Sequence, residues 1–278
     1  MKSVATLVFL SILLPGYLRA SVVIVNGLTH AHVLNGVENK IQGSIRVRNE
    51  GAKDSRILVY RQDLLPECGK STQYPDFNSH SRSLGEGLRT NVDEKLMAPS
   101  EEYDVRYTIE LPKEKTSPGT YWEVIMVEVA DPVKDEVKEG VQINSKVRYA
   151  IQVIVDVGDF EGPKVSFENV VFDKISPQRS VLKIQLKNNS AFGTRTNVIL
   201  EVYDNKGNKL KTTEPSARML YPGFCNTFEL PVNDLQSGKY DCVIIADTGK
   251  DLFGSNISIL HHLSRPINFS FHLHKKIK

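Results

Sequence analysis

Ser117-Pro-Gly-Thr-Tyr121-Trp-Glu-Val-Ile-Met-Val is a pattern that the chain repeats later as Ser237-Gly-Lys-Tyr240-Asp-Cys-Val-Ile-Ile-Ala. Each copy is a glycine-containing turn, then a tyrosine, then an apolar run rich in β-branched residues. In immunoglobulin-like sandwiches, a tyrosine at the start of strand F turns its hydroxyl back onto nearby backbone and fixes the corner between the sheets. The repeated pattern therefore predicts two such corners in one chain.

Two further landmarks repeat upstream of the tyrosines, in the same order. Residues 98–112 and 221–231 both place a proline-containing turn before a strand that ends in Glu-Leu-Pro, and Ile45-Arg-Val-Arg-Asn49 matches Ile184-Gln-Leu-Lys-Asn188. Three matched landmarks indicate an internal duplication. The polar and apolar residues alternate with period two, and no segment shows a helical period. We therefore predict an all-β protein with two consecutive immunoglobulin-like β-sandwich domains.

The expected boundaries follow from composition. Residues 1–20 form a predicted signal peptide, 21–157 the first sandwich, 163–263 the second sandwich and 264–278 a basic C-terminal tail. The joint, Gly158-Asp-Phe-Glu-Gly-Pro163, contains two glycines and a proline between long predicted strands. We expect seven strands in each sandwich, between residues 22 and 156 and between residues 164 and 261.

The first residues predict export. Lys2 precedes an apolar run from Val4 to Leu14, and Ala20 stands before Ser21, where we expect cleavage. The run is about half of the roughly 20 apolar residues that a transmembrane helix needs. We therefore expect a periplasmic or secreted protein, at the cell surface or free, with no stable membrane insertion after cleavage.

The charge balance argues against nucleic acid as a partner. Removal of residues 1–20 takes away two basic residues and no acidic residue, which leaves the mature chain with equal numbers of each. Binding to a phosphate backbone depends on clustered Lys and Arg. The only basic cluster in the sequence, His272-Leu-His-Lys-Lys-Ile-Lys278, is typical of a solvated chain end.

The motifs that would indicate an enzyme are missing from the sequence. It has no Gly-x-Ser-x-Gly elbow and no zinc-protease helix motif. Gly69-Lys-Ser-Thr72 resembles the end of a phosphate-binding loop, but Leu64 takes the place of the first glycine and no helix pattern follows. We predict a protein that is not an enzyme and needs no cofactor.

Histidine pairs raise the question of a metal site. His30 and His32 lie two residues apart, so on a strand they share one face and could supply two ligands. Residues 261–262 and 272–274 contain further pairs. A site needs a third or fourth ligand with oriented partners, and the sequence names none. We therefore expect surface histidines and no metal site.

Three cysteines are too few for a fold built on disulfides. Cys225 and Cys242 fall on successive predicted strands of the second domain, and Cys242 stands two residues after the corner tyrosine, where immunoglobulin domains place half of their bridge. A bridge between Cys225 and Cys242 and two buried thiols are both compatible with the sequence. Cys68 lies in a predicted loop.

The last strand of the first domain is the candidate binding element. On Lys146-Val-Arg-Tyr-Ala-Ile-Gln-Val-Ile-Val155, one face carries Val147, Tyr149, Ile151, Val153 and Val155, and the other begins with Lys146 and Arg148. One interpretation is an ordinary strand with its apolar face in the core. The other is an edge strand that pairs with a strand from another protein and fills its groove with side chains.

With these residues in view, the chain resembles bacterial extracytoplasmic proteins with two immunoglobulin-like domains. They are the PapD-like pilus chaperones and the WxL-interacting surface proteins. The likeness rests on the export signal, Gly43-Ser-Ile-Arg-Val-Arg-Asn-Glu-Gly51, Ala98-Pro-Ser100, Gly-Thr-Tyr-Trp122 and the strand 146–155. Pilus chaperones hold the C-terminal carboxylate of their subunit with an Arg near the first strand and a Lys on this last strand. Lys146 and Arg148 resemble the second anchor, whereas residues 21–26 contain no Arg.

Together these features predict an exported, non-enzymatic protein that binds another exported or surface protein. The leading hypothesis is a periplasmic chaperone-like factor that captures its partner by β-strand addition at residues 146–155. The alternative is a structural or adhesive component of the cell surface, which binds glycan, cell wall or matrix through the domain-1 loops 66–89 and 132–140.

Overall fold

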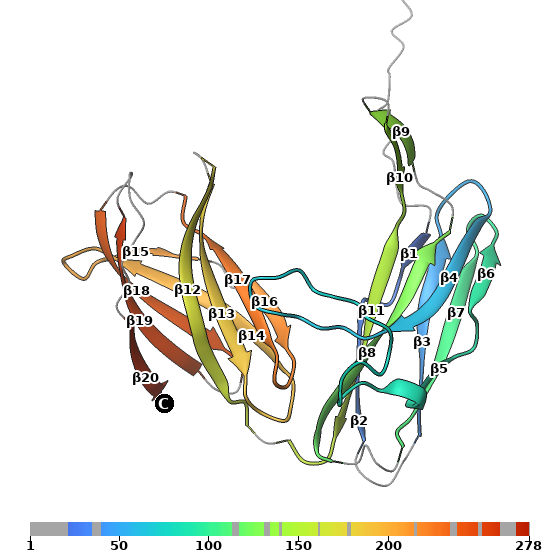
Figure 1. The fold of residues 1–278 in the computed structure, drawn as a ribbon, viewed down its shortest axis with the longest axis horizontal. Coiled ribbons are helices and arrows are strands. Elements are labelled where there is room, and N and C mark those ends of the chain that lie inside the picture. Colours follow the sequence, from blue (N-terminus) through green and yellow to red (C-terminus); the bar gives the residue numbers. More distant parts are fainter. Residues whose placement is uncertain are drawn as a thin grey trace, which may run out of the picture.

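A computed structural model describes residues 22–34, 40–112, 117–130, 134–138, 141–160, 162–176, 179–213, 216–233, 238–249, 252–261 and 271–277. The predicted signal peptide lies outside the described residues. Within them the chain folds into β-strands, one short 3-10 helix and connecting turns, and no helix is long and apolar enough to cross a bilayer. Figure 1 shows two sandwiches joined at one end by the segment between β11 and β12. The all-β prediction with two immunoglobulin-like sandwiches is confirmed.

The first sandwich consists of two facing sheets. One sheet has the order β1 (Val22–Ile24), β3 (Lys40–Asn49), β7 (Glu102–Glu110) and β5 (Leu88–Thr90). The other has the order β2 (Thr29–Leu34), β11 (Arg148–Val157), β8 (Gly119–Val129), β4 (Ser55–Gln62) and β6 (Glu94–Met97). Alternate residues of both sheets face inward, among them the fully buried Ile45, Val105 and Ile125. Burial of this apolar surface is the main source of the sandwich's stability.

The second sandwich repeats this plan. Its smaller sheet has the order β12 (Val165–Ser176), β13 (Arg179–Asn188) and β17 (Cys225–Pro231). Its larger sheet has the order β15 (Lys209–Thr212), β14 (Thr194–Tyr203), β18 (Gly238–Asp247), β19 (Leu252–His261) and β20 (Phe271–Ile277), and β16 (Ser216–Leu220) also pairs with β14. Leu186, Leu200 and Phe228 lie fully buried in its core.

The repeated sequence landmarks correspond to one repeated backbone device. Asn49 and Asn188 end equivalent strands, and both side chains are completely buried. The backbone carbonyl of each accepts from a residue in the left-handed region, Ser100 with φ 62° and Gly223 with φ 78°, over 2.9 Å in both domains. Each side-chain amide also donates to backbone carbonyls. The two sandwiches therefore close the same turn with the same chemistry, as the duplication predicts.

The tyrosine corner forms in the first domain. The Tyr121 hydroxyl donates to the carbonyl of Ser117 at 3.1 Å, and the ring is almost fully buried. The bond spans four residues and fixes the turn that enters β8, which is what the sequence pattern predicted.

Several elements differ from the strands that the sequence predicted. β5 and β9 (Lys134–Lys138) were not expected, and residues 143–156, predicted as one strand, are divided between β10 (Val141–Ser145) and β11. β2 was not expected, because Thr29–Leu34 has only a weak apolar alternation. Residues 217–230, predicted as one strand, contain the end of β16, a turn and most of β17. The segment 264–278, predicted as a tail, contains β20, which pairs antiparallel with β19.

Long-range contacts join the two sandwiches. The indole of Trp122 on β8 stacks on the ring of Tyr221 with 4.5 Å between centroids, and Phe224 meets the indole edge-on. The Trp122 Nε1 donates to the carbonyl of Leu64 at 2.9 Å, and the Tyr221 hydroxyl donates to Gln152 Oε1 at 2.8 Å. These residues form a third apolar cluster, which fills the junction between the domains. The buried polar groups in it are paired, as a stable interface requires.

The disulfide also crosses this junction. Cys68 of the first domain is bonded to Cys225 on β17, with 5.1 Å between their Cα atoms. Of the two alternatives that the sequence left open, a Cys225–Cys242 bridge is therefore wrong, and the alternative of two buried thiols is correct only for Cys242, which is a buried free thiol in the second core. The sequence analysis considered Cys225 only with its own domain, whereas the bridge joins residues 157 positions apart.

Candidate functional site: the open edge of β11

Strand β11 has a neighbour on one side along its whole length and on the other side along only part of it. β8 pairs antiparallel with β11 from Arg148 to Val157. β2 pairs parallel with β11 only from Gln152 to Val157. From Arg148 to Ile151, no strand in the described part of the chain pairs with the second side. The predicted edge strand is thus an edge over its first four residues and an interior strand over the rest.

The backbone groups at this open edge follow from the ladder. The carbonyl of Val147 accepts from Val129 on the β8 side, while the amide of Gln152 donates to the carbonyl of Leu28 on the β2 side. Because backbone directions alternate along a strand, Arg148 and Ala150 aim their N–H and C=O groups at the open side. These two residues form a short template for an added strand.

The apolar face of β11 lies in the first domain's own core. Ile151, Val153 and Val155 are completely buried, and Val147 and Tyr149 pack against the same core. The Tyr149 hydroxyl donates to the carbonyl of Val22 at 2.7 Å. The expectation that this face fills a partner's groove is therefore corrected, because its side chains already fill the space between the two sheets of the first sandwich.

The opposite face carries a charged cluster on the open half of the strand. Lys146 Nζ lies 3.2 Å from Glu128 Oε1, and Arg148 Nη2 lies 2.9 Å from Glu128 Oε2. The Tyr60 hydroxyl also donates to Glu128 Oε2, at 2.9 Å. Burial opposes ionisation of this carboxyl, but the hydrogen bonds from Tyr60, Lys146 and Arg148 hold the pKa of Glu128 below its ordinary value. Two cations thus share one carboxylate, and the cluster carries a net positive charge.

The cationic groups remain accessible to a partner. The side chains of Lys146 and Arg148 are 50% and 51% exposed, whereas that of Glu128 is 9% exposed. The Arg148 guanidinium also lies 5.9 Å from the centroid of the Tyr60 ring. Glu128 and Tyr60 therefore orient the two cations from below while their outer surfaces face solvent beside the open edge.

One exposed apolar residue lies next to the same edge. Leu28 is 47% exposed, and its carbonyl accepts from the Gln152 amide, which places it at the end of the space that an added strand would occupy. Val25 is 44% exposed, but its amide donates to Arg46 of the opposite sheet. The site therefore combines free backbone groups, two cations and an exposed leucine.

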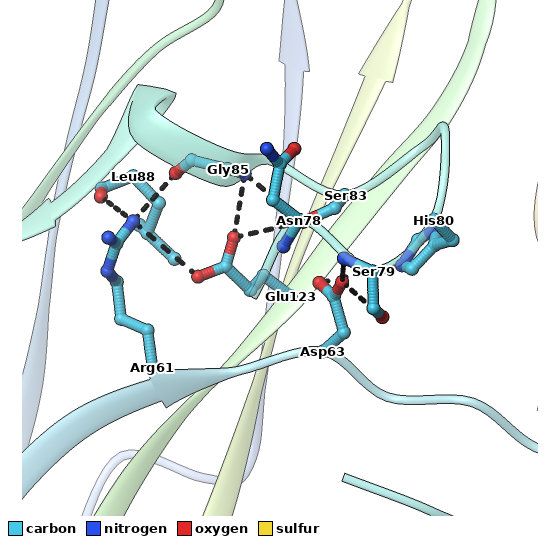
Figure 2. A network of polar contacts seen from close by, with 9 residues as sticks. All are labelled: Arg61, Asp63, Asn78, Ser79, His80, Ser83, Gly85, Leu88 and Glu123. Carbon is cyan, nitrogen blue, oxygen red and sulfur yellow. Dashed lines mark hydrogen bonds and ion pairs between the residues drawn. The ribbon is translucent and has the colours of Figure 1, made fainter. Parts of the chain in front are cut away.

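The loop after β4, which the alternative hypothesis assigns to glycan binding, is fastened to the protein at both ends. The disulfide at Cys68 and the bond from the Gly69 amide to Thr227 Oγ1 attach it to the second domain. Figure 2 shows how residues 78–88 of this loop cover a buried polar network on the first domain. Much of the loop's polar surface is therefore used inside the molecule.

Glu123 is at the centre of this network. It lies on β8, fully buried, with Oε2 accepting from the Gly85 amide at 2.8 Å and Oε1 3.6 Å from Arg61 Nη1. Arg61 also donates to the carbonyls of Gly85 and Leu88. Burial raises the pKa of Glu123 to about 8, although the Arg61 cation opposes the shift. The sequence did signal this site, because Glu123 is an acidic residue inside an apolar run.

A second carboxylate holds the other part of the loop. Asp63 is also fully buried, and its Oδ2 accepts from the amide of Ser79 at 2.6 Å and from the Ser79 hydroxyl at 2.8 Å. His80 Nε2 lies 3.6 Å from Asp63 Oδ1, and the His80 ring stacks on the Trp122 indole with 4.4 Å between the ring centroids. The loop therefore links the buried network to the aromatic cluster between the domains.

The described residues contain no group of three His, Cys, Asp or Glu side chains placed to hold a metal ion. The residues 69–72, which resemble the end of a phosphate loop, precede no helix, and the 3-10 helix is confined to Gly85–Gly87. Neither feature provides a catalytic arrangement.

No protein-family model and no curated protein matches the sequence. Among solved structures, the chain is similar to the CsuC–CsuE chaperone and tip-subunit pre-assembly complex of Acinetobacter baumannii archaic chaperone-usher Csu pili, with 12% identity and a TM-score of 0.46 over 85% of this chain and 98% of that one. It is similar to the Class 5 fimbriae chaperone CfaA, with 11% identity and a TM-score of 0.44 over 91% of this chain and 100% of that one. A PapD-like domain of human CEP192 shares 16% identity and a TM-score of 0.33 over 58% of this chain and 99% of that domain. The resemblance to PapD-like chaperones that the sequence suggested is thus found among solved structures, as a likeness of fold.

Proposed function

We propose that the protein is an exported, non-catalytic binding protein that holds an extended segment of another exported protein at the open edge of β11. The observation that carries the proposal is the unpaired edge at Arg148–Ile151. An extended segment placed there lies beside β11, in line with β2, and gains main-chain hydrogen bonds to Arg148 and Ala150. A binding role is compatible with the fold that the chain shares with fimbrial chaperones. The proposal itself is based on the unpaired edge of β11.

Lys146 and Arg148 define the kind of segment that fits. Their exposed cationic groups favour a segment with an acidic side chain or a chain-terminal carboxylate close to the paired residues. The exposed Leu28 favours an aliphatic residue at the opposite end of the segment. Strand pairing supplies orientation and part of the affinity, and these side chains supply the rest of the affinity together with selectivity.

A proline substitution tests the proposal sharply. Ala150→Pro removes an N–H that faces the open edge and leaves the β8 ladder intact, because the ladder uses the odd-numbered residues of β11. The expected result is loss of partner capture from the native envelope, with an unchanged circular dichroism spectrum.

Leu96→Pro is the matched control. β6 forms the opposite edge of the same sheet, and Leu96 is 57% exposed and faces outward. The register places Ile57 opposite Lys95, and the Val59 amide donates to Asp93, so the odd-numbered positions face β4. The control should therefore keep the partner. Capture that survives Ala150→Pro, or that fails equally in both variants, contradicts strand addition at β11.

A surface role in glycan or wall binding remains the alternative. The hairpin of β9 (Lys134–Lys138) and β10 (Val141–Ser145) extends beyond the first sandwich in Figure 1, and its first strand lies within the loop 132–140 that this role assigns. Replacement of residues 134–145 by a short Gly-Ser linker separates the two roles. Loss of attachment to isolated wall or glycan, with partner capture retained, supports the alternative.

A further inference from the structure

Two histidines and a tyrosine meet between the two sheets of the first sandwich, just past the end of the open edge of β11. His30 and His32 lie on β2, two residues apart, and their side chains point toward Tyr107 on β7 of the opposite sheet. His30 Nδ1 is 3.0 Å and His32 Nε2 is 2.9 Å from the Tyr107 hydroxyl oxygen. The sequence offers the histidine pair but no third ligand, and the fold brings a phenolic oxygen to it.

One of the two imidazole rings is oriented by the backbone. His30 Nε2 lies 3.4 Å from the carbonyl of Gly27, which can only accept a hydrogen bond. The hydrogen of this ring therefore resides on Nε2, and Nδ1 directs a lone pair at the Tyr107 oxygen. Metal-binding histidines are commonly held in this way by a carbonyl on the second ring nitrogen.

Gly43 makes room for the phenol. Gly43 lies opposite Tyr107 in the β3–β7 register, and a Cβ atom there would lie 2.6 Å or less from ring atoms and the hydroxyl oxygen of Tyr107. Any side chain at this position would push the phenol away from the histidines. The glycine thus fixes the position of the third group.

We propose that His30, His32 and Tyr107 form a binding site for one divalent transition-metal ion. Two imidazole nitrogens with one phenolic oxygen suit Cu²⁺ and Zn²⁺. Bonds of about 2.0 Å at tetrahedral angles place neighbouring ligand atoms about 3.3 Å apart. Each of the two nitrogen-to-phenol distances, 3.0 and 2.9 Å, therefore needs to open by only about 0.3 to 0.4 Å. A fourth position faces solvent, because β2 is an edge strand and both histidines are only partly buried.

The proton balance of binding is defined. Without the ion, His32 donates to the phenol oxygen and the phenol donates to His30 Nδ1. The ion replaces both hydrogens: the phenol proton leaves for solvent, and the His32 ring proton moves from Nε2 to Nδ1. Because binding releases the phenol proton to solvent, affinity should fall as pH falls.

Titration of the mature full-length chain with ZnCl₂ and with CuCl₂ tests the site. Calorimetry should give one tight ion per chain, and the copper form should show a phenolate-to-copper charge-transfer absorption. Tyr107→Phe keeps the ring packing and removes the oxygen, so it should abolish the absorption and weaken binding at least about 10-fold.

Tyr103→Phe is the matched control, because Tyr103 is a partly buried tyrosine on the same strand that bonds Asn91 instead of histidine. It should bind as the native chain does. Gly43→Ala retains all three ligands and should also weaken binding, since it displaces the phenol. The proposal is overturned if the native chain binds no ion in this range, or if Tyr107→Phe binds with unchanged stoichiometry and affinity. The second result would assign the ion to histidines elsewhere in the chain.

Discussion

Glu123 provides a direct test of the buried network that fastens the 63–89 segment. Its carboxyl is fully buried, and its pKa is raised from the ordinary value of 4.5 to about 8, mainly by burial. The folded protein therefore keeps this proton up to about pH 8, whereas the unfolded chain releases it above pH 4.5. The stabilising effect of the proton is fully present below pH 4.5 and is lost as pH rises through 8.

The size of the effect follows from the two pKa values. Each unit of difference corresponds to about 1.4 kcal/mol, so the contribution to the free energy of unfolding should fall by about 4 kcal/mol between pH 5 and pH 9. Glu123→Gln mimics the protonated carboxyl. Its amide oxygen can still accept from the Gly85 amide, and it has no proton to lose. The variant should therefore lack this part of the pH dependence.

Urea unfolding of both proteins at pH 5, 6, 7, 8 and 9 measures the difference. The single tryptophan of the chain, Trp122, is buried between the domains, so its fluorescence reports the state of the junction near this network. The native protein should lose stability relative to Glu123→Gln as pH rises. A constant difference across this range would refute the reasoning, because it would mean that Glu123 is ionised throughout and paired with Arg61.

Three further predictions concern the junction and the corner. Replacement of both Cys68 and Cys225 by Ser should lower the free energy of unfolding by about 2 to 5 kcal/mol, because the bridge closes a loop of 157 residues, and reduction of the native protein should reproduce the loss in urea unfolding. Tyr221→Phe removes the hydrogen bond to Gln152 and should cost about 0.5 to 1.5 kcal/mol, while the Trp122 emission of the folded protein stays unchanged, since the two rings remain stacked; an unchanged midpoint would show that the bond does not contribute. Tyr121→Phe should destabilise by a similar amount in the same assay through loss of the bond to Ser117, without a change in the oxidised disulfide.

The fold class could be predicted because the strongest patterns in the sequence are local or repeated. The period-two alternation and the tyrosine corner at Tyr121 depend on residues close in the chain. The asparagines Asn49 and Asn188 bond distant residues, but the sequence repeats them in the same order in both domains, which makes the duplication visible.

The candidate site could be predicted only in part, because its limits depend on distant segments. The sequence identified residues 146–155, but the partial cover by β2 depends on a parallel pairing with a segment more than 100 residues earlier. The sequence of Thr29–Leu34 did not indicate a strand, since its inward positions include two histidines and its outward positions include Val33, which is 61% exposed. The inter-domain disulfide was missed for a similar reason, because the sequence does not show how the two sandwiches face each other.

The partial cover of β11 restricts how a partner can bind. From Gln152 onward, β2 occupies one side of the strand and Tyr221 of the second domain bonds the Gln152 side chain. An added segment can therefore extend only toward Lys146, and it ends where β2 begins. Its backbone pairs with Arg148 and Ala150 alone, which gives few main-chain bonds, each of modest net strength. Strand pairing by itself is then too weak for a stable complex. The charged cluster at Glu128 and the exposed Leu28 before β2 must supply the remaining affinity, and substitution of Lys146 and Arg148 should weaken capture as severely as the proline at position 150.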